Sequence, residues 1–410
     1  MEILVYAHWK GMPIPKKMGI LTALKGKRKM TYSFEYSREW LTSGEHFLLD
    51  PDIQFYSGRQ FPSNINFGIF LDSMPDTWGR TLMKRRAILK SETNNFKTLD
   101  NTDYLLGVYD ESRMGALRFK LSENGNFLDD STDFPTPPWS SVRELQYGAG
   151  VIETSGNKKE LNKWLNLLMA PGSSLGGARP KANIIDKNGH LWIAKFPSKN
   201  DDTDKALWEY LAYRLATEAG INMSKSIIKK VAGKYHTFFT QRFDRENKER
   251  IHFASAMTMT GNNEEILRDN PATYLDIAEF IQFNSTDVEE DLRQLWRRIV
   301  FNIAISNTDD HLRNHGFILQ EKGWRLSPAF DINPSIDKQG LALNIDNENN
   351  NLDFELAKNV GKYFMLNDNQ MNKILNEVIS TVSRWKTVAK QIGIPRNETL
   401  LMKGAFRTKY

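Results

Sequence analysis

Apolar and polar positions alternate along two short segments near the start of the chain. Residues 2–8 alternate weakly, and residues 30–36 alternate clearly, with four apolar side chains on one face. A period of two residues predicts half-buried strands at both places. Residues 76–89 have the composition of a helix, and Pro75 and Asp76 stand where a helix start is expected.

Helices and a hairpin are predicted for the middle of the chain. Residues 141–169 are mostly helical, with an expected break at the glycines of residues 148–150. Two strands, residues 181–185 and 191–196, are joined by a turn that contains an Asn-Gly pair. That pair is a strong signal for a β-hairpin.

The later part of the chain is dominated by helical periodicity. The elements expected there are a helix at 204–219, strands at 226–228 and 236–241, helices at 275–283, 286–305 and 368–392, and a hairpin at 316–326. We therefore expect an α+β fold with a mixed first half and a mostly helical second half.

Composition excludes several classes of protein. The 410 residues correspond to about two or three domains. The chain has no cysteine, which excludes disulfides, thiolate metal sites and cysteine nucleophiles and fits a reducing cytoplasm. We find no signal peptide and no apolar run near the ~18 residues of a membrane span, so we expect a cytoplasmic protein. A net charge of +5 permits contact with nucleic acid without requiring it.

The most informative stretch is residues 307–314, Asn-Thr-Asp-Asp-His-Leu-Arg-Asn, between a predicted helix and a predicted hairpin. Asp309 and Asn314 have the Asp-x-x-x-x-Asn spacing of a kinase catalytic loop. In such a loop the Asp accepts or orients the proton of the substrate hydroxyl, and the Asn binds magnesium. Asp331, beyond the hairpin, is placed to supply a second metal-binding oxygen group.

The same loop has two other interpretations. Asn and Asp are common in loops that cap helices, but the hairpin followed by Asp331 favours the kinase interpretation. His311 and His315 could share a face as zinc ligands. A zinc protease would have Glu after the first His, where this chain has Leu312, and no third ligand is identifiable.

A second set of residues suits the phosphates of a nucleotide. In the loop of residues 171–181, Gly176 and Gly177 would let backbone N–H groups approach phosphate oxygens, although a flexible linker has the same composition. Lys195 lies in an apolar strand, where ATP phosphates would offset its charge. Glu209 in the following helix could hold that lysine. A lysine reaching water and a surface glutamate are the alternatives.

Several motifs taken together resemble one known family. They are residues 74–80 (MPDTWGR), 115–119 (GALRF), 174–181 (SLGGARPK), 242–245 (RFDR), 307–314 and 330–331 (FD). The chain resembles the HipA-type serine/threonine kinases, the toxin half of HipA/HipB toxin–antitoxin pairs. The resemblance covers nearly the whole chain.

This resemblance implies roles for the matching residues. Asp309 would be the catalytic base, Asn314 and Asp331 would bind Mg²⁺, and Lys195 would bind the ATP phosphates, with His311 close to them.

In the hinge motif, Gln241 and Phe243 would border the adenine and Asp244 would lie near the ribose. The family commonly has Glu where this chain has Gln241, which affects only a contact made by a carboxylate.

The resemblance also implies regulation and partners. Ser174, or the adjacent Ser173, would be autophosphorylated, which ejects the loop and switches the kinase off; a phosphate adds about −1.5 to −2 charges. The partner would be a HipB-like helix-turn-helix antitoxin that binds operator DNA as a complex. The protein substrate would be a translation factor such as an aminoacyl-tRNA synthetase. The basic residues 80–90 are a candidate DNA or antitoxin contact, for which a solvated helix face is the simpler interpretation.

We therefore expect a two-lobed, protein-kinase-like fold with an extra N-terminal subdomain. The expected domains are residues 1–118, a nucleotide-binding small lobe at 119–245, and a helical lobe at 246–410, with residues 120–138 as a linker or exposed loop. Two other functions stay open: a small-molecule kinase, and a catalytically idle co-repressor scaffold that binds the antitoxin. The complete set of motifs argues against lost catalysis.

Overall fold

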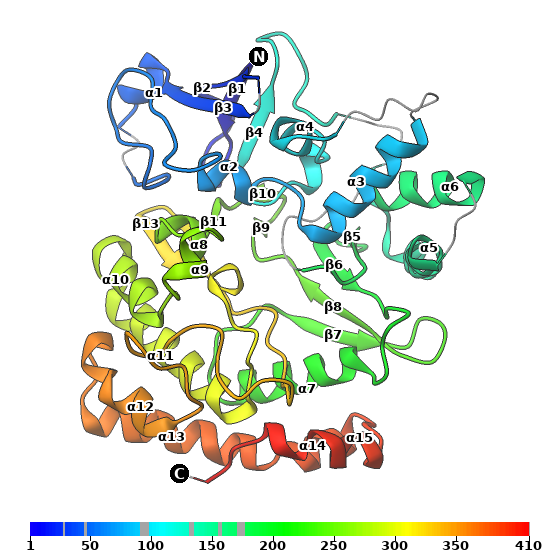
Figure 1. Cartoon of the computed structure of the whole chain (residues 1–410), viewed down its shortest axis with the longest axis vertical. Coiled ribbons are helices and arrows are strands. Elements are labelled where there is room, and N and C mark those ends of the chain that lie inside the picture. The colour runs from blue at the N-terminus through cyan, green and yellow to red at the C-terminus, as the bar shows by residue number, and fades with distance from the viewer. Residues whose placement is uncertain are drawn as a thin grey trace. The chain divides into compact units, whose positions relative to one another are not determined.

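The structure is a computed structural model that describes the chain except residues 28, 45–46, 91–97, 131–134, 155–157, 170–176 and 410. The chain divides into two compact units. The first unit comprises Met1–Asn200, Gln241–Ala254 and Leu319–Glu321, and the second comprises Asp201–Thr240, Ser255–Ile318 and Lys322–Tyr410. Helices and strands occur in both units (Figure 1), so the expected mixture of α and β structure is confirmed. The division into three domains stays a prediction.

The first unit begins with an antiparallel sheet of strand order β3-β2-β1-β4. Its strands are β1 (Glu2–Ala7), β2 (Lys16–Lys25), β3 (Met30–Tyr36) and β4 (Leu117–Lys120). Both strands predicted from alternation are present. Tyr32, Phe34 and Tyr36 are buried, as the pattern requires. The accompanying helices are α1 (Arg38–Leu41), α2 (Gly68–Asp72), α3 (Thr77–Lys90) and α4 (Asn101–Leu106).

The next two helices of the first unit are α5 (Val142–Thr154) and α6 (Lys158–Met169). The predicted break at residues 148–150 is wrong, because α5 runs through these glycines without interruption. A Cβ on Gly148 would lie 2.5 Å from Cε3 of Trp164, which belongs to α6. The glycine is therefore required by close helix–helix contact rather than by a turn.

Two hairpins complete the first unit. Strands β5 (Lys181–Ile185) and β6 (Leu191–Lys195) are antiparallel, with Lys181 opposite Lys195 at one end and Ile185 opposite Leu191 at the turn. This is the hairpin predicted from the Asn-Gly pair. Strands β9 (Arg245–Glu246) and β10 (Glu249–Arg250) form a second, shorter hairpin.

The second unit is mostly helical. Its elements include α7 (Lys205–Glu218), β7 (Ser226–Lys229), β8 (Thr237–Gln241), α8 (Ala256–Met259), α9 (Ile266–Asp269), α10 (Tyr274–Asn284), α11 (Val288–Ile305), β12 (Gly316–Gln320), β13 (Gly323–Leu326), α12 (Phe354–Asn359), α13 (Asp368–Ser383), α14 (Trp385–Gln391) and α15 (Arg396–Leu401). Strand β11 (Phe253–Ser255) and the ends of β8 and β12 fall at the boundaries between the units. The centre of the unit is α11, whose residues 298–305 are all buried.

The single helix predicted over residues 368–392 is divided into two helices in the structure. The segment is helical as expected, but Arg384 separates α13 from α14. The N–H of Arg384 bonds the carbonyl of Thr381, a tighter turn than the α-helix makes. This turn is followed by Trp385, whose ring stacks on Phe406 with centroids 4.0 Å apart.

No helix among the residues that the structure describes is both long and apolar enough to span a bilayer.

Candidate functional site

The 307–314 loop follows α11 directly, and its first residues are firmly held. Ser306, which ends the helix, has a left-handed backbone with φ of +51°. Its hydroxyl donates to the carbonyl of Ala405 at 2.7 Å. Asn307 donates through its backbone N–H and its side-chain Nδ2 to the two carbonyl oxygens of Asn302, at 2.9 and 3.0 Å. The chain therefore leaves the helix in one defined direction.

Asp309 and Asn314 are brought together as the spacing predicts. Nδ2 of the buried Asn314 donates to the backbone carbonyl of Asp309 at 3.0 Å. The Asp309 side chain is 79% exposed, and Lys338 Nζ lies 3.7 Å from its Oδ1. The loop thus anchors the Asp309 backbone while its carboxylate faces solvent.

The neighbouring Asp310 was not identified from sequence. Its Oδ2 accepts hydrogen bonds from the hydroxyl of Tyr274 at 2.6 Å, Nε2 of His315 at 2.7 Å and Nδ2 of Asn302 at 2.8 Å. Burial alone would raise the pKa of this carboxyl, but His315 and the hydroxyl of Tyr274 outweigh that effect and lower it. Asp310 is therefore an ionised carboxylate inside the unit that fixes the loop beside Asp309.

Asp331 is joined to the same loop through its neighbours in the chain. Asn333 donates from Nδ2 to Asp331 Oδ1 at 3.3 Å, and from its backbone N–H to Asn307 Oδ1 at 3.4 Å. The N–H of Ser335 donates to the carbonyl of Ser306 at 3.1 Å. With the Lys338–Asp309 ion pair, these contacts hold residues 331–338 alongside residues 306–309. Asp331 itself has a φ of +57°, a backbone state uncommon outside glycine and often found at functional sites.

The oxygens here suit magnesium better than zinc. Within the part of the chain that the structure describes, no group of three or more His, Cys, Asp or Glu side chains could hold a metal ion. Magnesium needs only one or two protein oxygens when phosphates and water complete its shell. Because Nδ2 of Asn314 is used toward Asp309, its Oδ1 is the atom left for a cation, together with the Asp331 carboxylate. His311 starts the short 3-10 turn Leu312–Asn314 and is exposed.

Lys195 and the phosphate-loop residues belong to the first unit. Lys195 is 8% exposed at the end of β6, opposite Lys181 in the hairpin. Gly177 precedes β5, and its carbonyl accepts from Lys181 Nζ at 2.9 Å. Ser173, Ser174 and Gly176 lie outside the described residues. Glu209 is buried on α7, in the second unit.

The MPDTWGR motif has a partner that sequence reasoning missed. Asp76 forms a buried ion pair with Lys181, Oδ2 to Nζ at 2.8 Å, and also accepts from the N–H of Gly79 at 2.8 Å. Trp78 Nε1 donates to the carbonyl of Lys181 at 3.0 Å. Burial raises the pKa of Asp76 despite the ion pair. The motif therefore holds Lys181, the last residue of the SLGGARPK segment, through both its side chain and its backbone.

The hinge, residues 241–245, is organised around a buried carboxylate. Both oxygens of Asp244, which is 0% exposed, accept from Arg242, Nε to Oδ1 at 2.8 Å and Nη2 to Oδ2 at 2.6 Å. Arg245 Nη1 and the N–H of Gly115 add bonds of 2.6 and 2.9 Å to Oδ2. Burial opposes ionisation, yet the two guanidinium groups lower the pKa of Asp244 to about 2. Phe243 contacts the ring of Phe253, centroids 5.7 Å apart.

The predicted site residues thus form two sets. Asp309, His311, Asn314 and Asp331 belong to the second unit, while Lys195, Gly177, Gln241, Phe243 and Asp244 belong to the first. The roles expected for these residues stay predictions. Both oxygens of the Asp244 carboxylate already accept hydrogen bonds from arginines.

A family model described as the HipA-like C-terminal domain matches residues 173–385, more than half of the chain. A putative kinase of Haemophilus influenzae is 28% identical over 179 residues, which are 39% of this chain and 52% of that protein. The chain thus spans about half the length of that relative. The serine/threonine-protein kinase toxin HipA of Shewanella oneidensis is 23% identical over 360 residues, 78% of this chain and 74% of that one.

Among solved structures, the chain is similar to a chain of the Shewanella oneidensis MR-1 toxin–antitoxin complex of HipA, HipB and operator DNA. The TM-score is 0.67 at 16% identity, and the match covers 98% of this chain and 94% of that one. The expected kinase-like α+β fold is confirmed by this match.

Proposed function

The chain belongs to the HipA family, and from this premise we propose that it is an ATP- and Mg²⁺-dependent serine/threonine protein kinase. We further propose that it acts in the cytoplasm as the growth-arresting toxin of a toxin–antitoxin pair. The observation that carries the proposal is the exposed Asp309 carboxylate, held through its backbone by Asn314 beside a segment that begins with Asp331.

In the proposed reaction, the substrate hydroxyl gives its proton to a carboxylate oxygen of Asp309. The hydroxyl oxygen attacks the γ-phosphorus of ATP, and the bond from that phosphorus to the β–γ bridging oxygen breaks, so that ADP leaves. Asp309 suits this role because its carboxylate is accessible while its backbone is fixed. A positioned general base contributes about 10²- to 10⁴-fold to such a rate.

Magnesium would neutralise phosphate charge in this reaction. Asn314 Oδ1 and the Asp331 carboxylate would hold it, since both are hard oxygen donors on segments joined through Asn333.

The first unit would supply most of the nucleotide contacts. Lys195 would bind ATP phosphates, and Gly177 with Gly176 would approach them through the backbone. His311, which belongs to the second unit, is the remaining residue expected near the phosphates. Gln241 and Phe243 would border the adenine. Asp244 would shape the hinge through its arginine pairs, since these occupy both of its carboxylate oxygens; its nearness to the ribose stays a prediction.

Regulation and partners follow from the family. We propose that Ser174 is the autophosphorylation site, with Ser173 as the neighbouring acceptor. We propose a HipB-like helix-turn-helix antitoxin as partner, operator DNA as a ligand of the joint complex, and a translation factor such as an aminoacyl-tRNA synthetase as substrate. The likeness to a chain from a complex of HipA, HipB and operator DNA supports the antitoxin and the DNA as partners.

The test is a phosphorylation assay on the purified chain. Wild type, Asp309→Ala and the control Asp269→Ala are incubated with Mg-ATP and analysed by intact-mass and peptide mass spectrometry. Asp269 is an exposed residue of α9, outside the proposed machinery. We expect phosphate on Ser174 or Ser173 in wild type and control, and a loss of about 10²-fold or more in Asp309→Ala.

ATP binding by calorimetry separates the alternatives. Asp309→Ala should still bind Mg-ATP, because the residue is proposed to act on the hydroxyl proton. No phosphate in any variant together with no ATP binding would contradict the kinase proposal and favour the idle co-repressor. ATP binding with phosphate transferred only to a metabolite would favour the small-molecule kinase.

A further inference from the structure

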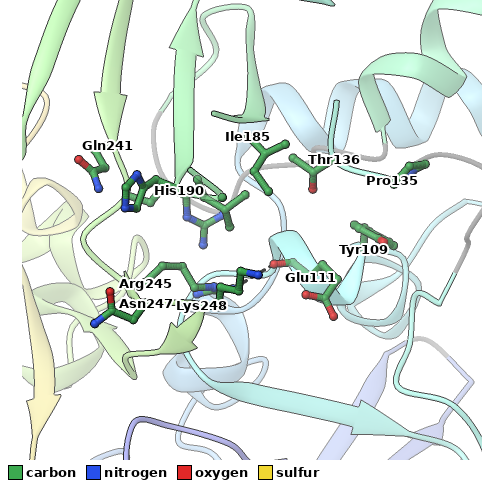
Figure 2. Close-up of a pocket in the computed structure, with 13 residues that line it drawn as sticks. Tyr109, Glu111, Pro135, Thr136, Ile185, His190, Gln241, Arg245, Asn247 and Lys248 are labelled. Atoms are coloured by element: carbon green, nitrogen blue, oxygen red, sulfur yellow. Dashed lines mark hydrogen bonds between the residues drawn. The ribbon is translucent and has the colours of Figure 1, made fainter. Parts of the chain in front are cut away.

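A cavity of about 300 Å³ lies within the first unit, beside the hinge. Figure 2 shows Ile185 and Thr136 on one side of it and Lys248 on the opposite side, with Tyr109 and Glu111 between them at one end. This volume is at the lower end of the range for small-molecule sites.

The cavity is separate from the proposed phosphate contacts. It is lined by the turn end of the β5–β6 hairpin, where Ile185 pairs with Leu191, whereas Lys195 pairs with Lys181 at the other end. Four residue steps of roughly 3.3 Å put about 13 Å between the two ends.

The hinge borders the cavity. The N–H of Arg242 donates to the carbonyl of Leu191 at 2.9 Å, which joins the hinge to the β5–β6 hairpin beside the cavity. Gln241, which would border the adenine, also lines the cavity, whereas Phe243 does not (Figure 2). The cavity therefore adjoins the proposed adenine contacts at Gln241 and extends from there toward Thr136 and Tyr109.

Polar groups around the cavity lack partners within the described residues. Thr136 Oγ1 is buried and makes no hydrogen bond. The exposed Lys248 and the half-buried Tyr109 line the same space, and neither side chain takes part in a hydrogen bond or ion pair with a described residue. A buried polar atom left without a partner costs about 1–3 kcal/mol, so a ligand toward which the Thr136 side chain rotates its hydroxyl would be favoured.

Lys248 occupies a position where glycine would be easier to accommodate. Asn247 and Lys248 form the two-residue turn between β9 and β10, with φ of +48° and +71°. Such a turn favours Asn at the first position and Gly at the second. The lysine stem lies beside Gly189, where an added Cβ would be in ordinary van der Waals contact with Lys248 Cε at 3.4 Å. The fold therefore accepts backbone strain at this turn and places a lysine at the cavity.

The charge of the lining selects the sign of the ligand. Arg242, Arg245 and Lys248 line the cavity, against the single carboxylate of Glu111. Asp244 neutralises one charge of the two arginines, which leaves the lining positive. An anion is therefore the ligand that this surface attracts.

We propose that the cavity is a second ligand site, which binds a small phosphorylated or carboxylated molecule whose anionic group pairs with Lys248 and whose hydroxyl or amide groups bond Thr136 and Tyr109. The site lies against the hinge, so its occupancy would stabilise one hinge conformation. The proposal does not depend on kinase activity.

The test measures binding to the full chain by calorimetry with three probes. Ribose 5-phosphate and ribonate carry the two candidate anionic groups, and ribose is the neutral control. We expect at least one anion to bind with a Kd of about 1 mM or tighter and ribose to bind far more weakly. Lys248→Gly should weaken the anion about 10- to 100-fold, the range for one hydrogen bond to a charged group.

Controls separate this site from folding and from nucleotide binding. Lys248→Gly should unfold at the same or a higher temperature than wild type, because glycine tolerates positive φ. Lys187→Ala removes an exposed lysine of the neighbouring turn that does not line the cavity, and should bind the anion like wild type. Thr136→Val should weaken binding, and ATP binding should be equal in all variants.

Three results would overturn the proposal: neither anion binds, the anion binds equally to wild type and Lys248→Gly, or ribose binds as well as the anions. If ATP fails to bind to any variant while the anion still depends on Lys248, the kinase proposal fails and the second site stands.

Discussion

The hinge and the 307–314 loop each contain a buried aspartate, and the two carboxylates are held in different ways. Asp244 in the hinge is bound through both oxygens by the guanidinium groups of Arg242 and Arg245. Asp310 in the loop is bound through one oxygen by a hydroxyl, an amide and the imidazole of His315.

The two sets of partners should respond differently when one group of the set is removed. Guanidinium groups stay charged over the whole accessible pH range, so the hinge is held by fixed charges that need one another. The groups that donate to Asp310 are a hydroxyl, an amide and an imidazole, and an imidazole, unlike a guanidinium group, can release its proton. The loss of one group therefore leaves no fixed charge behind. One substitution in the hinge should therefore cost most of the stability that the whole cluster supplies, whereas each substitution around Asp310 should lower the free energy of unfolding by a smaller amount.

The largest effect is expected when the hinge carboxylate is neutralised. Asp244→Asn leaves two buried guanidinium groups without a counter-charge and turns an amide toward their N–H groups. Removing one partner of a buried ion pair costs about 3–5 kcal/mol. Unfolding in urea should show this loss, and the exposed Glu35→Gln should change stability by less than about 0.5 kcal/mol. A loss below about 1 kcal/mol would contradict the charge-locked hinge.

Asp244 should also make the stability of the folded protein depend on pH in the acid range. The pKa of Asp244 is lowered from 3.8 to about 2 in the folded protein. A lowered pKa gives stability that is present above the unfolded value and is lost as pH falls through the folded value. Asp244 should thus account for about 2 kcal/mol of the loss below pH 3.8. Urea titrations at several pH values should give a flatter profile in this window for Asp244→Asn; parallel profiles would refute this assignment.

A smaller effect on stability is expected in the loop. Asp310→Asn keeps a carbonyl acceptor for its three donors but removes the charge, so we expect a loss of about 1–2 kcal/mol. Phosphoryl transfer should fall while ATP binding is retained, since Asp310 positions the backbone beside Asp309. Asp269→Asn is the matched control. If Asp310→Asn lost as much stability as Asp244→Asn, the proposed difference between the loop and the hinge would be contradicted.

The smallest change removes one donor from Asp310. Tyr274→Phe deletes a single hydrogen bond and should cost about 1 kcal/mol. Burial and Asp310 raise the pKa of Tyr274, so the hydroxyl remains a donor and the cost should be constant from pH 6 to pH 9. Tyr363→Phe, at an exposed position, should have no measurable effect in the same thermal unfolding assay.

Periodicity in sequence predicted the local elements well, and failed where contact with a distant element decides. The strands at residues 2–8 and 30–36 and the hairpins around residues 186 and 321 are local patterns, and all are present. The break expected at Gly148 is absent. The glycine is needed because a side chain at this position would clash with Trp164 of α6. That contact cannot be predicted from the sequence of the helix that contains the glycine.

The candidate site shows the same limit. The spacing of Asp309 and Asn314 marked both residues as one motif, and their contact is local because both lie in one short loop. The partners of Asp310 could not be predicted, since Tyr274 comes from α10, 36 positions earlier. The Asp76–Lys181 ion pair joins residues 105 positions apart. The proposed phosphorylation site, Ser174, lies outside the described residues and stays a prediction.

The contacts between residues 306–309 and 331–338 limit how the chain length can vary. Three connections, Ser306 to Ser335, Asn307 to Asn333 and Asp309 to Lys338, join the two segments, although their partners do not follow one another in chain order. An inserted or deleted residue in either segment would displace at least one of these partners. The loop at residues 346–349 closes on itself through the N–H of Ile345 and the carbonyl of Asn349, so extra residues there would leave both ends in place. Related chains, and engineered tags, should therefore differ in length at the second place and not at the first.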